Sequence, residues 1–300
     1  MVVTHELILM LQDLRLSSPE IVMSLMLFVS NPLFYLVMPL AVATYVLWFK
    51  DKKKGEWIVM NIVTGMFIGH FLKDVIRNPR PWITDDRIVP EEKALKGASG
   101  YSTPSGHSTD SASAFLSLAC VFGKRFLSLL FIAAMLLIMF ARLFLGVHTL
   151  MDVLTGVFIA IFVMLLNWVL ISVSYTSDGA YFRVSAVYFL LFMAILVPWI
   201  LIANDIGPIT SYGGIMLGTI IGRQIERSYI GYEPRMMDCR GVIKGLLIGW
   251  FIAGMMVAVP YLALDPQLGL MLGGFFGAIG IFTAAPFVLK KITKPALNDQ

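Results

Sequence analysis

The chain has little charge and almost no cysteine. Only 14% of its 300 residues are charged and 58% are hydrophobic, which is too apolar for a soluble fold of this size. Cys120 and Cys239 are the only cysteines, so we expect no disulfide framework and no zinc site. The net charge is only +4, and the pI near 9.0 indicates basic loops rather than nucleic-acid binding. The composition predicts a polytopic membrane protein.

The N-terminus lacks a basic stretch before its first apolar residues and has no small-residue cleavage site, so we expect no cleaved signal peptide. Two apolar runs follow, Leu7 to Leu11 and Ile21 to Val29. Each is shorter than the roughly 20 residues that cross a bilayer core. We therefore predict interfacial or re-entrant helices in residues 1–31.

The remaining sequence alternates long apolar runs with short polar segments. It predicts an all-α membrane bundle of about nine transmembrane helices. The expected spans are 32–49, 57–76, 104–123, 126–145, 147–173, 184–203, 207–222, 242–263 and 268–289. We divide the chain into N-terminal interfacial helices (1–31), a core (32–175) and additional C-terminal transmembrane helices (176–300).

Basic residues indicate the orientation of these spans. If the cluster from Lys50 to Lys54 is cytoplasmic, most of the 23 Lys and Arg residues fall on that side, as the positive-inside rule requires. The ends of the second and fourth spans, and the starts of the third and fifth, then share the non-cytoplasmic face.

The last third of the chain repeats glycine at every fourth position. The series are Gly214, Gly218 and Gly222; Gly241, Gly245 and Gly249; and Gly269, Gly273 and Gly277. Such faces favour close helix packing in lipid, and a transport path or ligand groove is the alternative. We interpret the charged residues within 223–233 as a salt-bridged cytoplasmic loop, with a headgroup site as the alternative.

A polar stretch, Pro104-Ser105-Gly106-His107-Ser108, opens the third span. A proline, a small residue and a glycine at a helix start leave backbone N–H groups accessible, and such groups favour anions. His107 lies within the first residues of this predicted helix. We interpret the stretch as half of a phosphate pocket.

Two more polar clusters fall on the same membrane face. They are Lys73, Arg77 and Arg80 at the end of the second span, and Arg142, His148 and Asp152 around the start of the fifth. A single cation at this depth could simply extend to lipid headgroups. Together, these cations, the Ser105 hydroxyl and the amides near Gly106 suit a tetrahedral dianion.

His148 and Asp152 are spaced i, i+4 on a helix expected to begin near Val147. The carboxylate can then accept a hydrogen bond from one imidazole nitrogen and leave the other as a nucleophile or base. A purely structural pair is the alternative. The nearby Arg142 favours the catalytic interpretation.

Two other groups of polar residues have weaker interpretations. His70, one turn before Lys73, either supports the site or bonds to another helix. The long polar loop contains four acidic residues, Asp85, Asp86, Glu91 and Glu92. They resemble a metal site only in number, and we interpret them as part of a solvated lid.

The three clusters together resemble the tripartite signature of the type 2 phosphatidic acid phosphatase superfamily. The motifs are Lys73 with six residues before Arg80-Pro81, then Pro104-Ser105-Gly106-His107, then Arg142 with five residues before His148 and three before Asp152. The resemblance covers roughly residues 30–175. The third motif usually opens with serine, and here Ala141 occupies that position, so one possible donor is lost.

The resemblance implies a role for each matching residue. His148 would be the nucleophile that forms a phosphohistidine, Asp152 would orient it, and His107 would protonate the leaving alkoxide. The phosphoryl oxygens would be held by Lys73, Arg80, Ser105, Gly106 and Arg142. No metal and no cofactor would be required.

On this resemblance, residues 32–175 are expected to form a multi-pass membrane phosphatase core, in the cell (inner) membrane if the protein is bacterial. The core would hydrolyse a lipid phosphate or lipid pyrophosphate at the non-cytoplasmic face. Its partners would be the lipid substrate and membrane lipids, not nucleic acid. The alternatives are a phosphotransferase with a lipid or sugar acceptor and a non-enzymatic membrane protein that binds anions or lipids.

Overall fold

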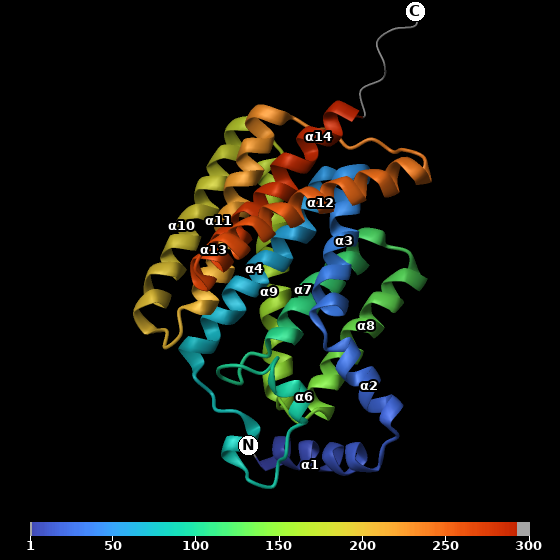
Figure 1. Cartoon of the computed structure of the whole chain (residues 1–300), viewed down its shortest axis with the longest axis vertical. Coiled ribbons are helices and arrows are strands. Elements are labelled where there is room, and N and C mark those ends of the chain that lie inside the picture. The colour runs from blue at the N-terminus through green and yellow to red at the C-terminus, as the bar shows by residue number, and fades with distance from the viewer. Residues whose placement is uncertain (1, 293–300) are drawn as a thin grey trace, which may run out of the picture. The chain divides into compact units, whose positions relative to one another are not determined.

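The computed structural model describes residues 2–292 and consists of helices (Figure 1). The described residues contain no strand, so the predicted all-α class is confirmed. The chain divides into two compact units: unit 1 is Met1–Leu40 with Thr64–Leu165, and unit 2 is Ala41–Val63 with Leu166–Gln300. Two long helices, α4 (Lys52–Ile76) and α9 (Leu150–Ser174), contribute residues to both units.

Seven stretches of the described chain are long and apolar enough to cross a membrane. They are Leu33–Lys50, Lys52–Thr84, Arg125–Phe144, Leu150–Ser174, Asp178–Ile202, Cys239–Ala263 and Pro266–Ile292. The two remaining predicted spans form α7 (Gly106–Phe122) and α11 (Gly207–Ile225), which are shorter or more polar. The protein is therefore a multi-pass membrane protein, and a total of nine spans stays a prediction.

Unit 1 is built around the pair formed by α7 and α8 (Arg125–Phe144), which pack along each other. The N-terminal helices α1 (Val2–Ser17) and α2 (Glu20–Val29) both contact α8, and the π-helical turn η1 (Leu33–Val37) contacts α7. Two short helices, α5 (Pro81–Thr84) and α6 (Glu92–Leu95), lie in the polar loop between α4 and α7. This loop and four helix ends carry the predicted site residues.

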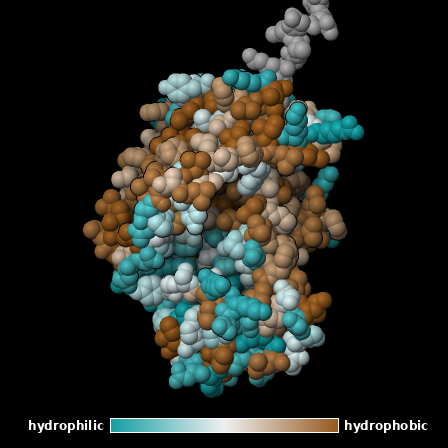
Figure 2. All heavy atoms as spheres, viewed as in Figure 1, coloured by the Kyte–Doolittle hydropathy of each residue, from teal (hydrophilic) through white to brown (hydrophobic). Residues whose placement is uncertain are grey.

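Unit 2 contains the C-terminal helices together with the start of α4 and the end of α9. Its further helices are α10 (Asp178–Ile202), α11, η3 (Glu226–Ile230), α12 (Cys239–Ala263), α13 (Pro266–Ile279), η4 (Gly280–Ala284) and α14 (Ala285–Ile292). On the face drawn in Figure 2, the surface over these helices is largely hydrophobic. Leu201 of α10 and Leu247 of α12 are exposed. Such a surface suits contact with lipid.

Glycine allows α11 and α13 to approach closely. A Cβ at Gly214 would lie 2.2 Å from the carbonyl oxygen of Met271, and one at Gly218 would lie 2.2 Å from that of Phe275. No larger residue fits at either position without moving the backbone of α13. The packing interpretation of this glycine series is thus confirmed.

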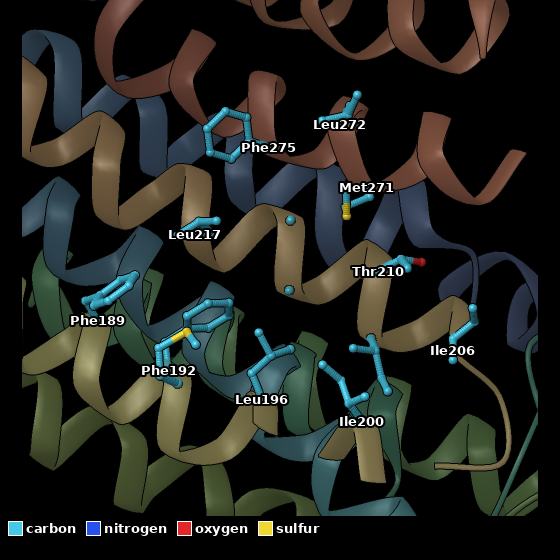
Figure 3. Close-up of a pocket in the computed structure, with 14 residues that line it drawn as sticks. Phe189, Phe192, Leu196, Ile200, Ile206, Thr210, Leu217, Met271, Leu272 and Phe275 are labelled. Carbon is cyan, nitrogen blue, oxygen red and sulfur yellow. The ribbon is translucent and has the colours of Figure 1, made fainter. Parts of the chain in front are cut away.

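A cavity of about 640 Å³ lies between α10, α11 and α13 (Figure 3). Its walls include Phe189, Phe192, Leu196, Leu217, Met271 and Phe275. Among all the lining residues only Thr210 has a polar side chain, and its hydroxyl donates to the carbonyl of Gly207. A lining without charge cannot hold a phosphate group, so this cavity is not the predicted anion site.

Candidate active site

All eight predicted site residues lie in unit 1, and all are buried. Lys73 comes from the last turn of α4, Arg80 directly precedes α5, and Arg142 is in the last turn of α8. The others are Ser105, Gly106 and His107 at the start of α7, and His148 and Asp152 around the start of α9. Several helix ends therefore converge on one buried polar cluster.

The start of α7 presents donors, as the sequence predicts. Ser105 caps the helix, and its Oγ accepts hydrogen bonds from the amide of Ser108 at 3.4 Å and from the Ser108 hydroxyl at 3.0 Å. Because the oxygen accepts both bonds, the Ser105 hydroxyl can donate to another group. A Cβ at Gly106 would lie 3.5 Å from the His70 ring and 3.8 Å from Lys73 Cε. These two side chains of α4 therefore lie against the helix start, and a Cβ at Gly106 would make only ordinary van der Waals contact with them.

Four donors converge on the carboxylate of Asp152. Oδ2 accepts from the amide of Thr149 at 2.6 Å and from the Ser102 hydroxyl at 2.7 Å. Oδ1 accepts from the Thr103 hydroxyl and from Asn78 Nδ2, the latter at 3.5 Å. This network fixes the carboxylate in one orientation and favours its charged form.

His148 does not lie on a helix, contrary to the prediction that a helix begins near Val147. Gly146 adopts a left-handed turn with φ +73°, and α9 begins only at Leu150. Thr149 and Asp152 bond to each other's backbone amides, and this reciprocal cap sets the helix start. The i, i+4 spacing therefore brings His148 to Asp152 through a turn and a cap.

The His148 ring faces the carboxylate with Nδ1, which lies 3.7 Å from Asp152 Oδ2. This is an ion-pair distance and is longer than the predicted hydrogen bond. Burial lowers the pKa of His148 well below its usual range; the Asp152 carboxylate opposes this shift, and the charge of Arg80 adds to it. The ring is therefore neutral at neutral pH, and a neutral ring has one nitrogen with a free lone pair.

Arg80 also contacts the His148 ring. Its Nη1 donates to the carbonyl of Val147 at 3.0 Å and lies 3.1 Å from His148 Nε2 and 3.5 Å from His148 Nδ1. In the neutral tautomer that carries its proton on Nδ1, the nitrogen nearer Asp152, the free lone pair lies on Nε2.

The other cations are bonded to backbone oxygen. Lys73 Nζ donates to the carbonyl of Tyr101 at 2.9 Å, and Arg142 Nη2 donates to that of Gly97 at 3.3 Å. In the described part of the chain, the buried Nε of Arg142 has no hydrogen-bond partner. Arg77 differs from these residues because it is exposed and donates to the carbonyl of Asp74.

His107 is held by the N-terminal part of unit 1. Its Nε2 lies 3.2 Å from the carbonyl oxygen of Ser30, and the Tyr35 ring lies against it with 4.5 Å between ring centroids. Arg142 and His148 are both close enough to interact electrostatically with the ring. The sequence does not reveal Ser30, because its contribution is a backbone oxygen. It does not reveal Tyr35 either, because Tyr35 is distant from every motif along the chain.

Three residues that hold Asp152 were also not singled out by sequence reasoning. Asn78 lies inside the first motif, and Ser102 and Thr103 directly precede the second. Their positions beside the motifs are a usable signal, because short polar side chains next to a site often orient its charged groups.

Asp85, one of the four acidic loop residues, pairs with Arg87 and not with the site cations. Arg87 donates to Asp85 through Nε at 3.0 Å and Nη2 at 2.8 Å, and these bonds lower the pKa of Asp85 to about 2. Arg87 also pairs with Glu6 of α1 at 3.0 Å. Among residues 2–292, no group of three or more His, Cys, Asp or Glu side chains is placed to hold a metal ion.

Comparison with known proteins agrees with the motif-based resemblance. The family model described as the PAP2 superfamily matches residues 56–177, an interval that contains all eight predicted site residues. No curated protein and no solved structure gave a significant match. Residues 56–177 of this membrane protein are therefore similar to the PAP2 superfamily.

Proposed function

We propose that this protein hydrolyses a lipid phosphate or lipid pyrophosphate through a phosphohistidine at His148, on the non-cytoplasmic face of the membrane. Similarity to the PAP2 superfamily supports phosphatase-type chemistry. The lipid substrate is proposed because the chain has seven candidate membrane spans. The side of the membrane rests on the distribution of Lys and Arg along the sequence.

One observation supports the proposal most directly. Lys73, Arg80 and Arg142 are buried, yet in the described part of the chain none of them forms an ion pair with a carboxylate within 4.0 Å. Buried cations are costly unless an anion compensates them. A phosphoryl dianion provides that compensation and can accept the donors that remain.

In the first step, the lone pair of His148 Nε2 attacks phosphorus, and the bond between phosphorus and the lipid oxygen breaks. His107 gives a proton to the leaving oxygen, because an alkoxide is a poor leaving group. The Arg80 N–H that contacts Nε2 in this structure would turn to a phosphoryl oxygen. Asp152 stabilises the positive charge that develops on the His148 ring.

In the second step, water attacks the phosphohistidine, the P–N bond breaks, and inorganic phosphate leaves. His107, now neutral, takes the proton from the attacking water, and His148 regains its lone pair. Charge on the transferring group is spread over its oxygens. Lys73, Arg142, the Ser105 hydroxyl and the amides near Gly106 would stabilise that charge as fixed donors.

Purified protein in detergent should release inorganic phosphate from at least one lipid phosphate or isoprenyl diphosphate without added divalent metal. The His148→Ala variant should lose about 10³-fold or more in kcat, because the nucleophile is removed. His5→Ala is a matched control, since His5 lies on α1 and contacts the Asp85 carboxylate rather than the cluster.

An unchanged rate in His148→Ala would contradict the mechanism. The product also separates hydrolysis from transfer. Labelled phosphate in solution supports the hydrolase, whereas label on a lipid or sugar acceptor would contradict hydrolysis and identify a phosphotransferase. A screen of phosphatidic acid, phosphatidylglycerol phosphate, isoprenyl diphosphates and sphingoid-base phosphates would then identify the substrate class.

A further inference from the structure

Five residues of the loop between α6 and α7, Gly97–Tyr101, lie beside all three of the candidate phosphate-binding cations. Arg80 donates through Nε to the carbonyl of Gly100 at 3.0 Å and through Nη2 to that of Ser99 at 2.6 Å. The Lys73 and Arg142 bonds to Tyr101 and Gly97 complete the set. A single short segment therefore supplies an acceptor to each cation.

Gly100 gives the segment its local shape. Its φ of +62° lies in the left-handed region, which side-chain-bearing residues rarely adopt, and an added Cβ would meet no atom within 4 Å. Glycine is needed there for backbone conformation and not for space. In this conformation the carbonyls of residues 99, 100 and 101 all accept hydrogen bonds from Lys73 or Arg80.

The same segment connects the cations to the rest of the site. A Cβ at Gly97 would lie 3.4 Å from the His107 ring, so the segment also touches the proposed general acid. Ser102 and Thr103, which follow directly, donate to Asp152. Residues 97–103 thus contact the cations, the acid and the carboxylate that faces His148.

Carbonyl oxygen is a suitable acceptor for this purpose because it is neutral. It orients an ammonium or guanidinium group without cancelling its charge, so the cation still attracts a phosphate. The bonds also leave donors unused. The Lys73 ammonium has three N–H groups and donates one to Tyr101, and Arg142 Nε has no partner within the described residues.

We propose that Gly97–Tyr101 is a positioning segment for the phosphoryl group, and that the left-handed turn at Gly100 sets the geometry of Lys73, Arg80 and Arg142. The inference rests on the proposed function for the identity of the bound group. Ligand binding by these cations can nevertheless be measured without turnover. The segment acts through the cations and is not itself catalytic.

The test compares substitutions at Gly100 in the full-length protein in detergent. Gly100→Ala should displace the carbonyls, weaken inorganic phosphate binding about tenfold or more, and raise KM. Phosphate binding is read from the phosphate concentration that gives half-maximal thermal stabilisation. The phosphate affinity and KM of Gly100→Asn should be closer to those of the original protein, because asparagine tolerates left-handed backbone better than alanine.

Gly231→Ala provides a matched control for the backbone effect. Gly231 has φ +56° and no atom within 4 Å of an added Cβ, but it lies in unit 2 after η3. The Gly231→Ala variant should lose thermal stability as Gly100→Ala does, yet keep the phosphate affinity and KM of the original protein.

Unchanged phosphate affinity and KM in Gly100→Ala would overturn the inference. An equal loss of phosphate affinity in Gly231→Ala would overturn it as well. The proposed function fails separately. If the original protein hydrolyses no lipid phosphate but binds phosphate in a way that Gly100→Ala weakens, the positioning role stands and the phosphatase proposal does not.

Discussion

Two buried polar clusters, one in each unit, differ in how their charges are satisfied. In unit 2, Glu56 accepts hydrogen bonds from Tyr175 at 2.7 Å, Tyr181 at 3.1 Å and Arg223 Nε at 2.5 Å. The Arg223 guanidinium also lies over the rings of Tyr181 and Tyr188. In unit 1, by contrast, buried cations contact backbone carbonyls and a histidine ring.

The balance of charges distinguishes a structural cluster from a candidate anion-binding site. Arg223 pairs with Glu56, and Lys52 pairs with Glu226 at 2.6 Å, so each of these unit 2 cations has its own carboxylate. In unit 1, Lys73 interacts electrostatically with two further cations and with two carboxylates, Asp110 and Asp152, and none of these three cations pairs with a described carboxylate within 4.0 Å. Buried cations without paired carboxylates therefore indicate an anion site more strongly than buried cations that are each paired with a carboxylate.

The pairs in unit 2 also resolve the interpretation of the charged residues within 223–233. Glu226 pairs with Lys52, and Arg227 pairs with Asp178 at 2.8 Å. The salt-bridged interpretation is confirmed for these residues. The headgroup alternative has no further support in this structure.

The largest expected effect is on stability in unit 2. Arg223→Met leaves the buried Glu56 carboxylate without its cation and should lower the free energy of unfolding by about 3–5 kcal/mol. Unfolding of the purified protein in detergent measures the change. Adding Glu56→Gln to the same protein should recover part of the loss, because the uncompensated charge is removed. A single variant as stable as the original would contradict the comparison.

The corresponding change in unit 1 should affect activity and not stability. Arg142→Met removes a buried cation that has no carboxylate partner, so the unfolding midpoint should stay the same or rise. The value of kcat/KM for the lipid phosphate should fall by about 10²–10³-fold, because a fixed donor to the transition state is lost. A loss of stability like that of Arg223→Met would show that both clusters are structural.

A smaller and more selective effect is expected at His107. His107→Ala should reduce turnover of alkyl phosphates about 10–100-fold more than turnover of p-nitrophenyl phosphate, whose leaving group needs little protonation. The two substrates serve as controls for each other in one preparation. Equal losses on both would mean that His107 only binds the phosphoryl group.

Sequence reasoning found the charged residues of unit 1 because charge is conspicuous in an apolar chain. Arg80, Arg142 and Asp152 stand out at the ends of apolar runs, and the structure buries all three. The all-α class followed from the same runs. Long uncharged segments have few alternatives to helices in a membrane.

Backbone contributions could not be predicted in the same way. The carbonyls of Ser30, Gly97 and Tyr101 bond to site residues, but a carbonyl is common to every residue type. The start of α9 was misplaced because the turn at Gly146 and the Thr149 cap interrupt an apolar run that reads as continuous helix. Local hydrogen bonds override hydrophobic periodicity at such positions.

The bonds around Glu56 have a consequence for protein engineering. Glu56 lies at the first residue of the PAP2-superfamily segment, whereas Arg223 lies in a helix well beyond its end at residue 177. The segment and the added helices are thus not interchangeable modules. A shortened chain that ended at residue 177 would retain the Glu56 carboxylate but would lack Arg223, the cation that pairs with it. Transplanting the segment alone would therefore require Glu56 to be neutralised first.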